Sequence, residues 1–280
     1  MYYKIENDFL TCEIDDMGAQ LHSLVSKENG KEYIWQGNPD IWYGQAPVLF
    51  PVIGQLINDK FRYNGVEYTM PKHGIARRYV FNVKECGGAK AVFSLESNEK
   101  TLEAYPFEFE YILTFELKGK ALVNTMTVVN KTKGDMYFSV GAHPGFNCKV
   151  GDIIEFEQSE TLATERIDKE SLIIPEKFPF IENSKSFEIT KEIFEPDALI
   201  LSDIKSEKLT IKGDNTVEFT FGKCPFLGIW AKPGAPYVCI EPWYGVNDGR
   251  EVKKDISEKR GIQHLGEGET FEFSWTAEIK

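Results

Sequence analysis

Apolar and polar residues alternate with a period of two along several separate stretches of this chain. The alternation is strict at residues 271–279, where every second residue is apolar or aromatic, and it also runs through residues 107–117 and 121–129. A strand places successive side chains on opposite faces, so this pattern predicts strands with one buried face. The 20 Phe and 12 Tyr residues favour strands as well.

Shorter strands and hairpins are expected throughout the remaining sequence. Strands are predicted at residues 10–14, 20–25, 33–35, 92–95, 137–140 and 153–156, and hairpins at 61–68 and 209–221. Only residues 102–105 and 252–259 look helical. Because no linker or internal repeat divides the 280 residues, we predict one all-β domain over residues 1–280, a large antiparallel β-sandwich.

Charge and cysteine content restrict the class of protein. The net charge of -12, with no tract rich in Lys or Arg, argues against a nucleic-acid partner. The five cysteines are scattered and form no CxxC pair, so we expect buried reduced thiols rather than disulfides or a zinc site. The sequence shows neither a signal-peptide pattern nor an apolar run of membrane-spanning length, which predicts a cytoplasmic protein without membrane contact.

One carboxylate stands out in the stretch YVCIEPWYG at residues 237–245. Glu241 lies where an apolar, strand-like run meets a turn. Apolar and aromatic neighbours desolvate a carboxylate and raise its pKa towards the range of a general base. The alternative is an exposed acid that ends a strand. Trp243, beside it, offers the flat apolar face that a sugar-binding cleft needs.

Two histidines lie in turns that contain glycine. His73 lies in KHGIAR at residues 72–77, and His143 lies in GAHPGF at residues 141–146. Either could be a purely structural histidine. Placed at strand ends, however, both imidazoles could exchange hydrogen bonds with the oxygen atoms of a ligand. Two histidines and a carboxylate, without a nucleophile, suit proton transfer at a sugar hemiacetal, in which a base and an acid open and reclose the ring.

Other catalytic motifs are missing from the sequence. It contains no HxH or HExxH pair, no GxSxG serine and no glycine-rich nucleotide-binding motif. We therefore predict that the protein needs neither a metal nor another cofactor.

Taken together, the motifs KHGIAR, GAHPGF and CIEPW (residues 239–243), in this order, resemble the three signature regions of the aldose 1-epimerases, or galactose mutarotases. The likeness is greatest to the bacterial mutarotase-like branch found in lactose operons, and it extends over essentially the whole chain. It implies the galactose mutarotase-like supersandwich fold and a cofactor-free interconversion of sugar anomers.

The resemblance also implies roles for individual residues. Glu241 would match the family's general base, His143 the acid that protonates the ring oxygen, and His73 a second histidine that polarises nearby oxygens. For the family's substrate-binding aspartate the better match is Asp197, with Asp203 as the weaker candidate.

The sequence departs from the family pattern at one binding position. Where many members have an arginine that contacts a sugar hydroxyl, this chain has Gln55, which brings hydrogen bonds but no charge. Arg77, four residues after His73, could replace that arginine or could be a surface charge.

Three functions remain open at this point. The expected function is an aldose 1-epimerase acting on a free hexose. The alternatives are a mutarotase acting on a hexose 6-phosphate and a carbohydrate-binding or sensing protein without turnover. The expected partner is the small aldose itself, and the protein could be a monomer or a homodimer.

Overall fold

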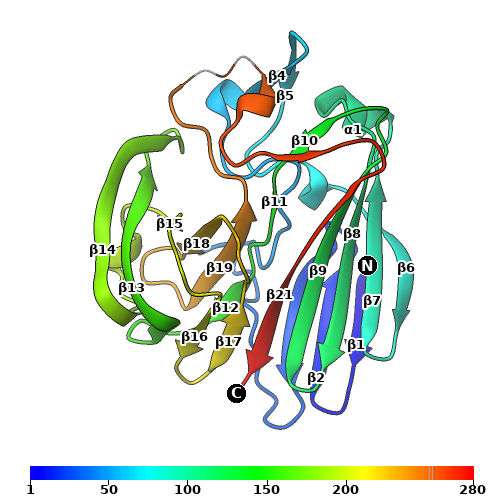
Figure 1. Ribbon diagram of the computed structural model, residues 1–280. Helices are drawn as coiled ribbons and strands as arrows, with labels where there is room; N and C mark the ends of the chain where they lie inside the picture. The colour runs from blue at the N-terminus through cyan, green and yellow to red at the C-terminus, as the bar shows by residue number, and fades with distance from the viewer. Residues whose placement is uncertain (252, 254) are drawn as a thin grey trace.

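The computed structural model describes residues 1–251, 253 and 255–280, and strands dominate this part of the chain (Figure 1). The strands are β1 (Tyr2–Glu6), β2 (Leu10–Asp15), β3 (Gln20–Ser26), β4 (Lys60–Tyr63), β5 (Val66–Thr69), β6 (Asn82–Gly87), β7 (Lys90–Glu96), β8 (Phe109–Lys118), β9 (Ala121–Asn130), β10 (Met136–Phe138), β11 (Val140–Gly141), β12 (Gly145–Asn147), β13 (Ile153–Ile167), β14 (Ile173–Glu188), β15 (Leu199–Leu201), β16 (Lys208–Lys212), β17 (Val217–Thr220), β18 (Phe226–Trp230), β19 (Tyr237–Tyr244), β20 (Gln263–Leu265) and β21 (Thr270–Ile279). The helical segments are η1 (Ile57–Asp59), η2 (Ala76–Arg78), α1 (Glu99–Ala104), η3 (Glu192–Phe194) and η4 (Ile256–Glu258).

The all-β prediction is confirmed by a 14-stranded sheet within the described residues. Its order is β11-β19-β18-β15-β13-β16-β17-β21-β9-β8-β7-β6, with β12 also on β19 and β14 also on β13. The pairs within it are antiparallel, and β1, β2 and β3 form a separate antiparallel sheet. The ring of Tyr3 on β1 packs 5.6 Å from that of Phe93 on β7, so the small sheet packs against this part of the large one.

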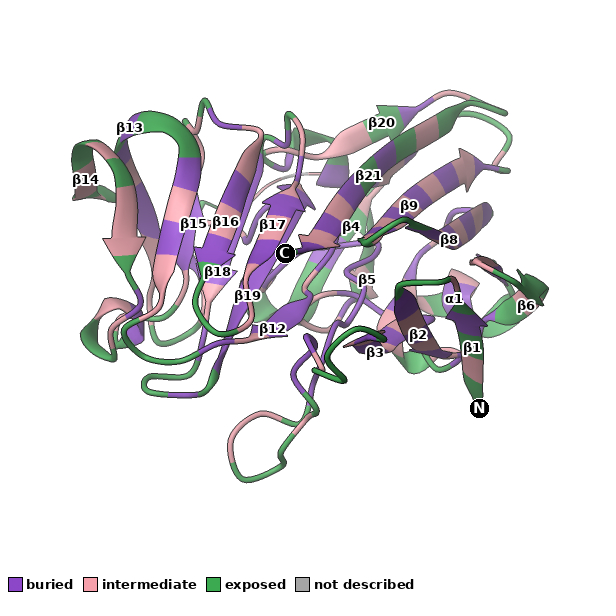
Figure 2. Ribbon diagram, turned by 90° about the horizontal axis from the view of Figure 1, so that it is seen from below, coloured by how far each residue is buried: buried purple, intermediate pink, exposed green. Residues whose placement is uncertain are grey.

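Alternation along the sequence becomes alternation of burial in the structure. In β8 and β9 nearly every second residue is buried, and the banding is visible across β9, β21 and β17 in Figure 2. The predicted hairpin at 61–68 is β4–β5, and the predicted hairpin at 209–221 is β16–β17. The long alternating stretches therefore define the core strands, as expected from their period.

Several local expectations need correction. Residues 33–35 do not form a regular strand: Ile34 makes an isolated bridge to Phe146 as the chain leaves β3. The strand expected at 153–156 is only the beginning of β13, whose later part pairs with β14 although charged residues interrupt its pattern.

The helical expectations are shifted. The expected helix at 102–105 begins earlier, as α1, because the Asn98 side chain accepts hydrogen bonds from the N–H groups of Lys100 and Thr101. Of residues 252–259, the short η4 is helical, while 252 and 254 lie outside the described residues.

The cysteines are free in the structure, and four of the five are buried. Cys86 is exposed, contrary to expectation, because it lies on the edge strand β6. Within the described part of the chain, no helix has both the length and the apolar character that crossing a membrane requires.

Candidate active site

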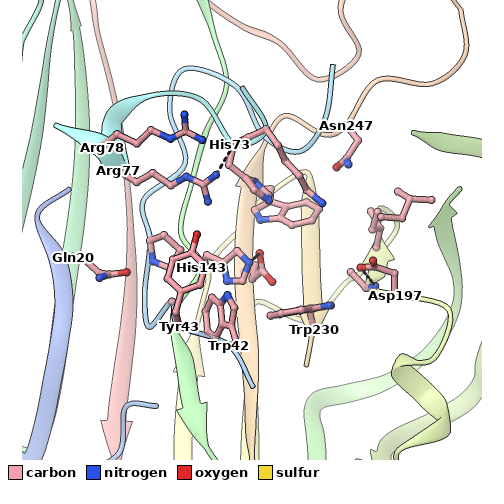
Figure 3. A pocket seen from close by; sticks show the side chains of 18 of the residues that line it. Gln20, Trp42, Tyr43, His73, Arg77, Arg78, His143, Asp197, Trp230 and Asn247 are labelled. Carbon is pink, nitrogen blue, oxygen red and sulfur yellow. Dashed lines mark hydrogen bonds and ion pairs between the residues drawn. The ribbon is translucent and has the colours of Figure 1, made fainter. Parts of the chain in front are cut away.

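A cleft with a volume of 520 Å³ opens beside β19 (Figure 3). Most of its lining comes from segments far apart in the sequence, within residues 42–47, 72–78, 197–200 and 241–247, together with His143 and Trp230. The three predicted catalytic residues, His73, His143 and Glu241, all line this cleft.

Strand register brings His143 and Glu241 together. β11 pairs Gly141 with Trp243, and β12 pairs Gly145 with Cys239, so the two short strands continue the same register along β19. In that register His143 lies opposite Glu241, where the ladder is interrupted. Directly opposed side chains in an antiparallel pair are close neighbours, and Nε2 of His143 lies 3.3 Å from Oε2 of Glu241.

The other neighbour of Glu241 has no side chain. On β18 the residue opposite Glu241 is Gly228, and a Cβ there would lie only 2.7 Å from the Trp243 ring. Trp243 is two residues along β19 and therefore faces the same side as Glu241. A glycine at this position leaves room for the indole beside the carboxylate.

Burial controls the ionisation of Glu241. Its side chain is 1% exposed, and its Oε2 atom has no hydrogen-bond partner among the described residues. Burial raises the pKa of Glu241 well above its usual value; the nearby Trp243 indole opposes this, and the Asp197 carboxylate adds to it. Glu241 therefore favours its protonated form.

His143 is enclosed by aromatic rings. The Trp42 ring stacks on it at 5.2 Å, and the rings of Trp230 and His73 meet it edge-on at 5.8 and 5.9 Å. Burial lowers the pKa of His143 to about 3, and the cations of Arg77 and Lys72 push it in the same direction. His143 therefore favours its neutral form.

Because the shifts are opposite, His143 and Glu241 retain one proton between them over a wide range of pH. A concerted acid and base pair could use this proton once it passes from Oε2 of Glu241 to Nε2 of His143, which lies 3.3 Å away. A substrate hydroxyl could occupy the unfilled hydrogen-bonding position at Oε2 of Glu241.

His73 is held in one tautomer by its own loop. The backbone N–H of Gly54 donates to Nδ1 of His73 at 3.1 Å, and the His73 N–H donates to the Gly54 carbonyl at 2.9 Å. Burial lowers the pKa of His73 well below its usual value. The neutral ring therefore carries its hydrogen on Nε2, which makes it a hydrogen-bond donor to a ligand oxygen.

The predicted binding residues fall into two groups. Asp197, Arg77 and Trp243 line the cleft. Gln55 lies outside it, because its amide donates to Asp59 at 2.6 Å and to the Leu56 carbonyl at 3.0 Å.

The two candidate aspartates can be separated by their positions. Asp197 lies on the opposite side of His143 from Arg77 and Arg78 in Figure 3. Asp203 is paired with Lys177 at 2.7 Å and does not line the cleft. We therefore retain Asp197 as the candidate substrate-binding acid.

Further cleft residues were missed at the level of sequence. Trp42 and Tyr43 come from the aromatic loop after β3, where residue composition was the only available signal. Trp230 reaches the cleft because β18 pairs with β19, an adjacency that alternation alone does not reveal. Asn247 also lines the cleft, and its Nδ2 atom donates to the Ser171 carbonyl at 2.8 Å.

One cluster, which includes His143 and Glu241, has ligand types that metals use. Ligand atoms of His143, Cys239 and Glu241 lie within 4.8 Å of one another. Burial raises the pKa of the Cys239 thiol well above its usual value, and this disfavours the thiolate that a metal would require. A reaction without metal stays a prediction.

Two sequence comparisons identify a matching family model and a relative of this chain. The family model described as aldose 1-epimerase matches residues 1–254. Protein LacX (plasmid) of Lactococcus lactis subsp. lactis is 32% identical over 281 residues, which cover 92% of this chain and 93% of LacX.

Solved structures share the fold along the whole chain. A galactose mutarotase related enzyme from Lactobacillus acidophilus has a TM-score of 0.94 and 32% identity, and the match covers 100% of this chain and 97% of that one. A galactose mutarotase-like protein from Lactobacillus casei ATCC 334 has a TM-score of 0.95 and 27% identity, with 100% of both chains covered.

Proposed function

The chain belongs to the aldose 1-epimerase family, and we propose that it interconverts the α and β anomers of an aldose by general acid and base catalysis. The observation that carries the proposal is the buried pair of His143 and Glu241, whose Nε2 and Oε2 atoms lie 3.3 Å apart in the cleft. In a pyranose the C1 hydroxyl and the ring oxygen are bonded to the same carbon. An acid and a base that act on both oxygens must therefore be close neighbours.

The proposed reaction moves one proton onto the substrate and one off it. The proton of the pair, which rests on Glu241, first passes to Nε2 of His143 across the 3.3 Å between them. Glu241 then accepts the proton of the C1 hydroxyl while His143 donates its proton to the ring oxygen, and the bond between C1 and the ring oxygen breaks. Rotation about the C1–C2 bond of the open-chain aldehyde presents its other face. Ring closure reverses both transfers, so the pair ends with the proton it had at the start.

Other cleft residues have supporting roles in this proposal. His73 donates from Nε2 to a sugar oxygen, and Asp197 accepts from a hydroxyl. Trp42 and Trp230 enclose His143 and offer apolar faces to the sugar ring. We also propose that residues 1–280 act as one domain and that the aldose is the partner, with the protein a monomer or homodimer in the cytoplasm.

Polarimetry tests the proposal directly. Freshly dissolved α-D-glucose and α-D-galactose should reach their equilibrium rotation faster with the protein than in buffer alone, after subtraction of the spontaneous rate. Binding of these sugars without any acceleration would instead favour the carbohydrate-binding alternative.

A further inference from the structure

Three cations line the catalytic cleft without a carboxylate partner. Lys72, Arg77 and Arg78 all contribute to its lining, and no ion pair links any of them to an acid in the described part of the chain. We call these three residues the cationic wall. The protein as a whole carries a net charge of -12, so acids are abundant elsewhere.

The hydrogen bonds within the cationic wall leave most donors free. Arg77 donates through one guanidinium nitrogen to the Lys72 carbonyl at 2.8 Å, and the Lys72 ammonium donates to the Ser171 hydroxyl at 3.2 Å. A guanidinium has five N–H donors in a planar fork that matches a carboxylate or phosphate. Arg77 is partly buried, and a partly buried charge without a counter-ion is energetically unfavourable. An anionic ligand beside the guanidinium would offset this cost.

The backbone that carries the two arginines is fixed in place. The N–H groups of Ile75 and Ala76 donate to the Phe50 carbonyl at 2.9 and 3.1 Å, just before Arg77. A Cβ on Gly18 would lie 2.9 Å from the Arg77 Cα, so the loop between β2 and β3 packs closely on η2. The side chains of Arg77 and Arg78 therefore start from one fixed turn, and they lie next to each other in Figure 3.

Nearby acids do not neutralise the cationic wall. Asp15 lines the same cleft, but its carboxylate accepts from the Met1 ammonium at 3.4 Å and from the Met17 N–H at 3.2 Å. Asp197 lies on the far side of His143 from both arginines (Figure 3). The two arginines and Asp197 thus lie on opposite sides of His143.

We propose that the cleft takes an aldose bearing an anionic group, a phosphate ester or a carboxylate, which the cationic wall of Lys72, Arg77 and Arg78 binds. This inference rests on the proposed function for the position of C1 at His143 and Glu241. It adds that the end of the sugar remote from C1 points towards the arginines.

Calorimetry on the wild-type protein tests this, because anomerisation does not change an equilibrated sugar solution. Glucose, glucose 6-phosphate and glucuronate form one series, and galactose, galactose 6-phosphate and galacturonate form another. We expect at least one anionic form to bind roughly ten- to a hundredfold more tightly than its neutral parent, as hydrogen bonds to charged groups allow. A preference for the ester identifies a sugar phosphate, and a preference for the acid identifies a hexuronate.

Three variants complete the experiment. Arg77→Gln and Arg78→Gln should each reduce the ratio of anionic to neutral affinity, whereas Arg62→Gln, an exposed arginine on β4 outside the cleft, should not. Equal affinity for neutral and anionic sugars, or a preference that survives both cleft variants, would overturn the inference. Failure of the proposed function would give a different result from failure of this inference, because anionic sugars would then bind to the cationic wall without being anomerised.

Discussion

His143 Nε2 lies 3.3 Å from Glu241 Oε2 at the point where the ladder between β19 and its two short partners is interrupted. Backbone hydrogen bonds from Ala142 to the Pro242 carbonyl and from Ile240 to the Pro144 carbonyl, each 3.2 Å long, flank the pair and fix the distance between its side chains. The pairing of the sheet therefore positions both side chains, and their geometry is as rigid as its register.

The pH dependence of activity should reflect the pair and not an isolated histidine. The pKa of His143 is lowered to about 3 and that of Glu241 is raised, both mainly by burial, so the pair keeps one proton from acid through neutral pH. We expect kcat/KM, corrected for buffer catalysis, to stay level between about pH 5 and pH 8. A fall in activity with a midpoint near the ordinary histidine value of 6.5 would contradict this.

Replacing Glu241 should stabilise the fold increasingly as the pH rises. The folded pKa of Glu241 lies above its ordinary value of 4.5, so below that value both folded and unfolded states hold the proton. Above it the unfolded state loses the proton first and is favoured, which costs the native state stability until the folded pKa is passed. Glu241→Gln removes this penalty. The difference in Tm between variant and wild type should grow from about pH 5 to about pH 8, and a constant difference would count against the raised pKa.

Gly54→Ala should damage both stability and the site. The Gly54 φ is +66°, and a Cβ there would lie 1.9 Å from the Asn247 side chain. Gly65 provides the matched control, since its φ is +79° and nothing lies within 4 Å of its Cβ position. Gly65→Ala should cost about 1 kcal/mol in the free energy of unfolding, from backbone strain alone. Urea unfolding should show a larger loss for Gly54→Ala, together with weaker sugar binding through His73; equal losses would mean that the contact with Asn247 relaxes freely.

Chelation of metals should leave the activity unchanged. The ligand types at His143, Cys239 and Glu241 are close enough to share an ion, but burial keeps the Cys239 thiol protonated and the Lys72 and Arg77 cations are near. Rates of anomer exchange before and after dialysis against excess EDTA provide the measurement. Activity lost on dialysis and recovered with one added metal would show that the reaction depends on it.

Local sequence patterns predicted those features of the structure that depend mainly on residues close together in the chain. Period-two alternation identified the core strands such as β8, β9 and β21, and the three motifs contained His73, His143 and Glu241, which meet in the cleft. Trp230 was missed because its position depends on the pairing of β18 with β19, which no single stretch encodes. Gln55 was expected in the cleft because of its place in the family pattern. In the folded loop its amide instead donates to the carboxylate of Asp59, and the sequence alone does not show this contact.

The sequence also did not show where some charged residues lie in the fold. Arg77 could have been a surface charge or a cleft residue, and the contact of η2 with the loop at Gly18 places it in the cleft. The extension of β13 beyond residue 156 was missed for a related reason. Its charged residues obscure the alternation, and pairing with β14 supplies the order.

The most direct test of the account is the rate of anomer exchange, measured by magnetisation transfer in NMR, for wild type, Glu241→Gln, His143→Ala and the double variant. If the two residues act as one acid and base pair, each single variant should lose about 10²- to 10⁴-fold of the enzymatic rate, and the double variant should lose little more. Sugar binding, checked by calorimetry in each variant, should persist. Losses that multiply in the double variant, or a single variant that retains the wild-type rate, would contradict the pair as the centre of catalysis.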